Sequence, residues 1–444
     1  MNSQTEAPAK NRGHAEDRRT SVPDRPAEFS RSEPRNLSAG RLLQSRWLAA
    51  SLMLLPLALV LTAVTPQYET NDDPGMSLIA AGRAITDHPD EHLVYSNVVI
   101  GLVLKQLYSW APEFPWYGGY LFATAALALA AVAFLLSRRD RGWRNIVLGA
   151  AFLLLLGVPY LTQIQFTRAA FLATLAGVLL LFDSVRDGSP RSAAWFALPF
   201  LVIGSLIRLD AHHLALVVLS PVLVYLVWKA RNDSRARRAV LLLAAVGAAG
   251  FGFAGFNTWY YERDPEWRGF YRFDNLRAEF IDYDRIEYNE TTAPVFASVG
   301  WQPVDLTMLK WWCFLDRDRF NTETLQTIVD GTAAHALPPK PRPWTGLWNI
   351  VARDSELWAL WIVGALLLLL LKPEPAFRLI PPACYAVATA VCVLLYFRLH
   401  LPARVYCPAF GACAIAVYYA AAGPRRFGLR WEWDRSAVGL SAVT

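Results

Sequence analysis

The sequence is poor in charged residues. Only 18% of its 444 residues are Asp, Glu, Lys or Arg, whereas about 25% is usual for a soluble globular protein. By a broad count, 54% of the residues are hydrophobic. The charged residues gather in short stretches between apolar runs of about 20 residues, the length that a helix needs to cross a hydrocarbon core of about 30 Å. The sequence therefore predicts an all-α polytopic membrane protein rather than a soluble domain.

Several motifs are also missing. The five cysteines are Cys313, Cys384, Cys392, Cys407 and Cys413. Their spacing shows neither a disulfide framework nor a metal-binding pattern. There is no Walker sequence, which argues against ATP-driven transport by this chain alone. The net charge of +6 does not predict binding to nucleic acid, because membrane topology accounts for the arginines.

About ten transmembrane helices are predicted. The apolar runs are 47–65, 117–136, 145–159, 161–182, 193–209, 211–228, 240–257, 356–371, 376–397 and 405–421. They divide the chain into a tail, an N-terminal transmembrane module with an acidic first outer loop, an extracytoplasmic loop domain, C-terminal transmembrane helices and a second tail. These parts are 1–44, 45–257 (with the loop 66–116), 258–355, 356–421 and 422–444. The polar tail 1–44 lacks periodicity and is expected to be disordered.

Basic residues set the expected orientation. The connectors 138–144 and 229–238 and the C-terminal tail are rich in arginine, and they fall on the same side as the arginine-bearing N-terminus. The opposite connector 66–93 has Arg83 as its single basic residue. By the positive-inside rule, both termini are cytoplasmic. Because no eukaryotic sorting signal is visible, we expect a bacterial inner membrane.

Two helices are predicted to lie in the outer membrane interface, at 74–86 and 94–110. If 94–110 crossed the membrane, every later basic connector would be moved to the outer side. The segment also carries a polar stripe at helical spacing, formed by Asn97, Gly101, Lys105 and Ser109. An amphipathic interfacial helix satisfies both observations.

An acidic stretch follows the first apolar run. It reads Tyr68-Glu69-Thr70-Asn71-Asp72-Asp73-Pro74-Gly75. Two adjacent carboxylates at a membrane surface could form a reaction centre. They could equally form a helix cap, since aspartate at the N-cap with proline as the first helical residue is a common helix start.

Charged residues at other predicted outer helix ends fall at one level of the membrane. The candidate substrate-binding residues are Arg168, Arg208, His212, Arg398, His400 and Arg404. Charges in or beside a membrane are costly, so a set at one depth requires a reason. Mutual salt bridges and snorkelling to the interface are one reason. The other is a cavity in which a carboxylate takes a proton from an acceptor hydroxyl while guanidinium groups hold a phosphate.

Other motifs have simpler explanations. The segment His88-Pro89-Asp90-Glu91-His92 resembles a metal-binding pattern, but Pro89 prevents a continuous helical face from starting at His88. A solvated turn is the preferred interpretation there. The aromatic residues of 258–355 are expected mainly in a small core or at the interface, although tryptophan and tyrosine can also stack on sugars.

The order of these elements resembles the GT-C superfamily of membrane glycosyltransferases, which use polyprenyl-phosphate-linked sugars. In that family an acidic motif follows the first span, and interfacial helices precede the second. Asn71-Asp72-Asp73, the helices 74–86 and 94–110, and the span 117–136 match that order. The resemblance covers residues 45 to 230. It implies that Asp72 or Asp73 activates the acceptor or positions a divalent cation, and that arginines hold the donor. Family members differ in metal use, so a requirement for Mg²⁺ or Mn²⁺ stays open.

The resemblance implies a glycosyltransferase that acts at the extracytoplasmic face. Its partners would be a polyprenyl-phosphate-linked sugar, a lipid or cell-surface glycan acceptor, and membrane lipids, with no role for nucleic acid. A polysaccharide polymerase or ligase is the main alternative, because such enzymes also use arginines outside the membrane. A transporter for lipid-linked glycans is a further alternative, although the sequence shows no paired repeat halves. A non-catalytic scaffold is the fourth.

Overall fold

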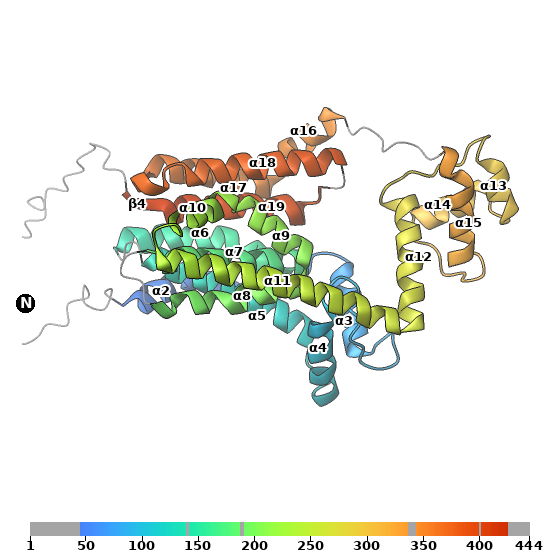
Figure 1. Ribbon diagram of the computed structural model, residues 1–444, viewed down its shortest axis with the longest axis horizontal. Coiled ribbons are helices and arrows are strands. Elements are labelled where there is room, and N and C mark those ends of the chain that lie inside the picture. The colour runs from blue at the N-terminus through green and yellow to red at the C-terminus, as the bar shows by residue number, and fades with distance from the viewer. Residues whose placement is uncertain (1–44, 139–141, 187–190, 336–342, 399–400, 425–444) are drawn as a thin grey trace, which may run out of the picture. The chain divides into compact units, whose positions relative to one another are not determined.

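The computed structural model describes residues 45–138, 142–186, 191–335, 343–398 and 401–424. Nearly all of the regular structure in these ranges is α-helical (Figure 1). The predicted tail 1–44, residues 425–444 of the predicted C-terminal tail, and His400 lie outside the described residues.

Within the described ranges, six helices are long and apolar enough to cross a membrane. They are α2 (Arg46–Ala63), α5 (Trp116–Ser137), α6 (Trp143–Thr162), α7 (Phe166–Ser184), α11 (Ser234–Arg263) and the segment Pro375–Arg398, which joins η3 (Pro375–Phe377) to α18 (Ile380–Arg398). A seventh span results if α9 (Leu209–Val218) and α10 (Ser220–Lys229), bent by 67° at Leu219, are counted as one. The prediction of a helical membrane protein is therefore confirmed.

The other predicted spans are also helical, but they do not meet the same criteria of length and hydropathy. They correspond to η1 and α8 (Arg191–Phe196 and Ala197–Ile207), α17 (Ser355–Leu370) and α19 (Ala403–Ala420). Two short strands, β3 (Leu371–Pro373) and β4 (Ala421–Pro424), pair antiparallel beyond α17 and α19. The total of ten spans stays a prediction.

The core is organised around α7, which is buried along almost its whole length. It packs against α5, α8, α9 and α19, while α2 packs against α5 and α6. Figure 1 shows these long helices running side by side. Small residues allow close approach: a Cβ at Gly204 of α8 would lie 2.9 Å from the Ala170 carbonyl oxygen of α7. Such small residues are typical of helix contacts in membranes.

The junction between α6 and α7 differs from the prediction. We predicted spans 145–159 and 161–182 with one residue between them, but α6 continues through Pro159 to Thr162, and α7 begins at Phe166. The residues between them form β2 (Gln163–Ile164), which pairs in parallel with β1 (Gln67–Tyr68). This two-residue ladder replaces helical hydrogen bonds at the break, and it holds the acidic stretch against the start of α7.

The two predicted interfacial helices are present with different bounds. The first, α3 (Asp72–Ala81), ends before Gly82, whose φ is +66°. A Cβ there would lie 2.1 Å from the His88 carbonyl carbon, so the chain turns at glycine instead of continuing to residue 86. The second, α4 (Val98–Trp110), starts at residue 98 because the Asn97 side chain caps it by accepting from Val99 N.

The polar stripe of α4 packs against protein. A Cβ at Gly101 would lie 1.8 Å from the Glu91 carbonyl oxygen, so only glycine permits this contact. Lys105 Nζ lies 2.5 Å from Glu91 Oε2. The stripe thus docks α4 onto the loop that precedes it.

Residues 265–335 form a group of short helices with a hydrophobic cluster of their own. The helices are α12 (Pro265–Ile281), α13 (Ala293–Ser298), α14 (Pro303–Lys310), α15 (Thr322–Thr332) and η2 (Ala333–His335). Phe280, Phe296 and Trp301 are among the buried members of the cluster. Beyond this group, α16 (Trp344–Arg353) precedes α17 directly, with Asp354 between them.

Candidate functional site

Arg168 in the first turn of α7 is the centre of an ion cluster. Its side chain is buried, and its Nε lies 2.9 Å from Glu69 Oε2. On its other side, Nη2 and Nη1 donate to the two carboxylate oxygens of Glu356 at 3.2 and 3.3 Å. The N-cap residue Gln165 accepts from Arg168 N at 2.9 Å and so fixes the turn. Arg168 therefore ties the acidic stretch and α17 to the start of α7.

A second, more open ion pair lies in the same cluster. Arg404 Nη1 is 3.4 Å from Asp72 Oδ2, and about a quarter of each side chain is exposed. Arg404 lies in the first turn of α19, and Asp72 is the first residue of α3. Glu69 interacts electrostatically with both Arg168 and Arg404. The two arginines and their carboxylates consequently form one connected network.

Asp73 has a different environment from its neighbour. It is completely buried, and its Oδ1 accepts from Tyr117 Oη at 2.9 Å and from Phe166 N at 3.2 Å. Thr70 Oγ1 donates to Oδ2 at 3.4 Å. Burial raises the pKa of Asp73 to about 7, and the hydrogen bonds from Tyr117 and Phe166 oppose that shift. Asp73 therefore fastens α3 to α5 and α7, whereas Asp72 remains accessible.

The predicted cap has a different form. The N-cap of α3 is Asn71, whose side chain makes no capping bond, and both aspartates lie inside the first turn. Pro74 is therefore the third helical residue rather than the first. The carboxylates still suit this place, because the amino end of a helix carries a partial positive charge.

The remaining predicted site residues are dispersed. The guanidinium of Arg208 lies over the rings of Phe166 and Tyr95, at 4.8 and 5.6 Å from their centroids, and it interacts electrostatically with Asp72 and Arg404. His212 is buried inside the bundle, where its Nδ1 lies 2.9 Å from Thr174 Oγ1. Arg398 is exposed at the end of α18. The structure thus joins Asp72, Asp73, Arg168 and Arg404, places Arg208 beside them, and places His212 elsewhere.

Sequence reasoning missed three residues of the cluster. Glu69 belongs to the acidic stretch that we singled out, but its partner could not be inferred without the β1–β2 ladder. Glu356 begins a predicted span. An acidic residue is common in the first turn of a helix and does not by itself indicate a site. Tyr117 begins another span, and its hydroxyl donates to Asp73 from 44 residues away.

A groove of about 400 Å³ lies beside this cluster, between α6 and α17. Its lining residues are Leu155, Leu156, Val158, Pro159, Thr162, Gln163, Ser355, Glu356, Ala359 and Leu360. Polar residues (Thr162, Gln163, Ser355 and Glu356) form a large part of the wall, and apolar side chains of α6 and α17 form the rest. Glu356 is also an ion-pair partner of Arg168, so the groove reaches the ion cluster at this residue.

Asp90, Glu91 and His92 form the one group of three neighbouring residues, among those described, that could hold a metal ion. Most of their polar atoms already have partners: His92 Nδ1 lies 2.6 Å from Asp90 Oδ1, and Tyr260 Oη donates to Glu91 Oε1 at 2.7 Å, whereas the buried His92 Nε2 has no hydrogen-bond partner among the described residues. Lys105 holds the other Glu91 oxygen. The expectation of a solvated turn was wrong for Glu91 and His92, which are buried under α11 and α12.

The apolar helices define a helical membrane protein, and the ion cluster beside the groove is its candidate site. The chain matches no protein-family model, no curated protein and no solved structure. The similarity to the GT-C superfamily therefore stays a prediction.

Proposed function

We propose that the protein is an integral-membrane glycosyltransferase. It transfers a sugar from a polyprenyl-phosphate donor to a lipid or cell-surface glycan acceptor at the extracytoplasmic face. We also propose that the chain crosses a bacterial inner membrane ten times, with both termini in the cytoplasm. Residues 258–355 would lie on the extracytoplasmic side. One observation supports the proposed function most: four helix amino ends meet in an ion network beside a groove that is lined by both polar and apolar residues.

The meeting of helix ends favours a phosphate. Asp72, Arg168, Glu356 and Arg404 all lie in the first turns of their helices, α3, α7, α17 and α19. The amino end of a helix attracts anions through its free N–H groups and its dipole. Arg404 adds a guanidinium that is partly open to solvent and is held by one carboxylate at 3.4 Å. A donor phosphate could replace that carboxylate on Arg404.

Replacing the carboxylate would also release Asp72 for chemistry. The oxygen of an acceptor hydroxyl attacks the anomeric carbon of the donor sugar, and the bond between that carbon and the phosphate oxygen breaks. Asp72 takes the hydroxyl proton, and polyprenyl phosphate leaves with the bonding electron pair. A general base contributes typically 10²–10⁴-fold to such a step, and the cation at the leaving phosphate stabilises its developing charge. Asp73, which is buried, would position α3 without touching substrate.

The groove between α6 and α17 suits the lipid part of the donor. The apolar part of its wall, formed by side chains such as Leu155, Leu156 and Leu360, would contact isoprenoid units. Its polar part at Glu356 leads to Arg168 and the phosphate position. Arg168 would serve as a fixed support rather than as a direct ligand, because both of its carboxylate partners already occupy its donors.

A divalent cation would need carboxylates that the cluster currently uses elsewhere. Glu69 and Glu356 hold Arg168, Asp72 holds Arg404, and Asp73 accepts from three donors. We therefore assign no step to a cation. Whether Mg²⁺ or Mn²⁺ is required is a separate question, answered by comparing transfer with and without a chelator.

The polymerase or ligase alternative rests on a specific observation as well. Arg404 is a partly exposed arginine in the first turn of α19, and it could serve such an enzyme without any carboxylate base. Substitution of Asp72 distinguishes the two proposals, because the glycosyltransferase requires this carboxylate and the ligase does not.

The test is glycan transfer in membranes that contain matched amounts of wild type, Asp72→Asn, Asp73→Asn or Arg404→Ala. Mass spectrometry would report the size and composition of surface and lipid-linked glycans. We expect Asp72→Asn and Arg404→Ala to lose transfer while lipid-linked donor accumulates. Asp73→Asn should retain transfer in proportion to its folded fraction.

Two results would contradict the proposal. If Asp72→Asn and Asp73→Asn keep full transfer while Arg404→Ala fails, the ligase alternative is favoured. If deletion of the whole chain changes no glycan, the protein is not a glycosyltransferase, and the ion network has a structural role.

A further inference from the structure

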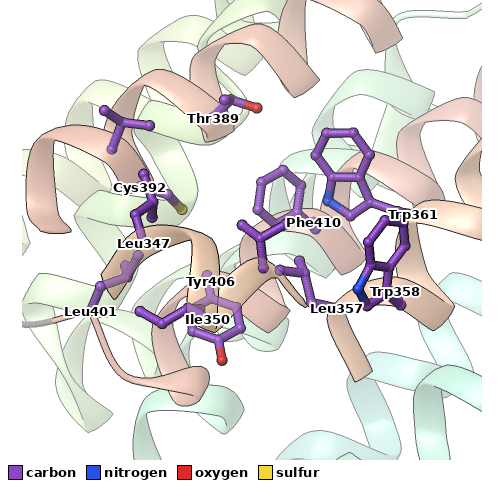
Figure 2. Close-up of a pocket in the computed structure, with 12 residues that line it drawn as sticks. Leu347, Ile350, Leu357, Trp358, Trp361, Thr389, Cys392, Leu401, Tyr406 and Phe410 are labelled. Carbon is purple, nitrogen blue, oxygen red and sulfur yellow. The ribbon is translucent and has the colours of Figure 1, made fainter. Parts of the chain in front are cut away.

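A second hollow lies on the opposite face of α17 from the groove. It is a partly open cavity of about 280 Å³ between α16, α17, α18 and α19. Figure 2 shows Trp358 and Trp361 of α17 facing Leu347 and Cys392 across it, with Phe410 between. Apolar side chains thus come from four helices and leave space that none of them fills.

The side chains that line the cavity favour a hydrocarbon ligand. The surface facing the cavity is apolar, and the hydroxyl of Tyr406 at its edge is taken by the carboxylate of Asp354. Apolar cavities stay dry and bind apolar molecules, as an engineered cavity of about 150 Å³ does with benzene. A water molecule would find no set of polar partners here. An aliphatic chain would regain the dispersion contacts that an empty space lacks.

The position of the cavity beneath α16 points to a membrane lipid. Trp344 and Trp348 of α16 are about two-thirds exposed, at 68% and 67%, and no residue of this helix is fully buried. Exposed tryptophans on a short amphipathic helix are typical of the membrane interface. Leu347, Ile350 and Val351, on the other side of α16, cover the cavity. The space beneath an interfacial helix lies at the depth of the upper acyl chains.

Charge at the ends of α16 adds a preference for an anionic headgroup. Arg353 ends α16, and Arg398 ends α18, whose last turns contact the start of α16 through the Tyr396–Pro343 hydrogen bond and the Phe397–Trp344 ring contact. Both arginines are exposed. Neither forms an ion pair with any residue that the structure describes. Exposed arginines beside a membrane attract anionic lipid headgroups.

The cavity is separate from the proposed donor groove. Ser355, Glu356, Ala359 and Leu360 of α17 face the groove, whereas Leu357, Trp358 and Trp361 face the cavity. Arg168 and Glu356 lie on the groove side. A lipid in the cavity would therefore be additional to the donor.

We propose that the cavity binds one acyl chain of an anionic membrane phospholipid, whose headgroup is held at the ends of α16 by Arg353 and Arg398. This site does not depend on the proposed function. It requires only that α16–α19 lie in a bilayer.

The experiment is photo-crosslinking of the full-length protein in lipid nanodiscs. The probe is phosphatidylglycerol with a diazirine in the middle of one acyl chain, used beside the same modification on phosphatidylcholine and on polyprenyl phosphate. Crosslinked peptides are mapped by mass spectrometry. Val393→Trp fills the cavity, and Leu394→Trp is the matched control, because Leu394 is 56% exposed and does not line it. Arg353→Gln with Arg398→Gln tests the headgroup, with Arg231→Gln and Arg238→Gln as controls.

We expect phosphatidylglycerol to label peptides 344–361 and 389–410 more strongly than phosphatidylcholine does. Val393→Trp should lower that labelling by about tenfold, the change expected when roughly two methylene groups lose an apolar site. Leu394→Trp and the control arginine variants should leave it unchanged. The double variant of Arg353 and Arg398 should remove the preference for phosphatidylglycerol.

Three outcomes would overturn the proposal. Labelling that Val393→Trp leaves unchanged, or that Leu394→Trp lowers equally, would show that the chain lies outside the cavity. Stronger labelling by the polyprenyl phosphate probe would assign the cavity to an isoprenoid lipid. Equal labelling by both phospholipids would exclude the headgroup contact. Sugar transfer is not measured in these experiments, so failure here and failure of the proposed function remain distinguishable.

Discussion

The two arginines of the candidate site lie in contrasting environments. Arg168 is 3% exposed and has a carboxylate on each side, whereas Arg404 is 28% exposed and has one carboxylate at 3.4 Å. The adjacent aspartates repeat the contrast, since Asp73 is buried with three donors and Asp72 is partly open. The cluster therefore has a buried half, Arg168 with Asp73, and an accessible half, Arg404 with Asp72.

This difference in burial predicts different roles for the two halves of the cluster. Removing one partner of a buried ion pair leaves an uncompensated charge in a medium of low polarity. An exposed pair contributes little to stability and exchanges partners readily, because water can replace either group. We infer that the buried half holds the helix ends together and that the accessible half meets substrate.

The largest effect is expected from Arg168→Ala. Glu69 and Glu356 would be left close together without their shared cation, which should destabilise the protein by about 3–5 kcal/mol. The measurement is thermal unfolding of purified protein in a fixed detergent, with Arg238→Ala as a surface control. A loss of sugar transfer with unchanged stability would contradict a supporting role for Arg168.

A smaller loss is expected from Asp73→Ala. The Tyr117 hydroxyl and the Phe166 amide would lose their acceptor, at a cost of about 1–3 kcal/mol. Asp73→Asn, which retains a carbonyl oxygen for these donors, should cost less. Unfolding measured in the same detergent checks the order of the two variants, and equal losses would show that the hydrogen bonds contribute little.

The pH dependence of stability should distinguish Asp73 from its neighbour. Burial raises the pKa of Asp73 from 3.8 to about 7, so the folded state binds a proton more tightly than the unfolded state does. The contribution of Asp73 to the free energy of unfolding should therefore be fully present below about pH 4 and should be lost as the pH rises toward 7. Wild type should lose stability over this interval relative to Asp73→Asn. Parallel curves for the two proteins would contradict the assignment.

The smallest effect on stability is expected from Arg404→Ala. An exposed pair is worth about 0–1 kcal/mol, so the unfolding temperature should change little. Arg404→Lys keeps the charge but loses the planar fork that suits a phosphate. It should therefore match wild type in stability and fall below it in transfer. A large loss of stability in either variant would place Arg404 with the buried half.

The sequence was sufficient to predict a helical membrane protein and the six long apolar helices of the described residues, because each depends on a continuous apolar run. It placed Asp72, Asp73, Arg168, Arg208, His212, Arg398, His400 and Arg404 at one membrane depth, and the structure brings only some of these residues together. It could not predict the Arg168–Glu356 pair, which joins residues 188 positions apart. The different environments of Asp72 and Asp73 depend on contacts with Tyr117 and Phe166. The end of α3 depends on the close approach of His88 to Gly82. These are tertiary contacts with no local signal.

The most direct test of the account is single-turnover transfer by purified protein in nanodiscs, with a labelled polyprenyl-phosphate sugar and excess acceptor. Wild type and Asp72→Asn would be compared at equal folded amounts, with donor binding measured separately. We expect unchanged stability and near-normal donor binding in Asp72→Asn, with transfer slowed by roughly 10²-fold or more. Transfer at the wild-type rate in Asp72→Asn would contradict the assignment of the accessible half as the reaction centre.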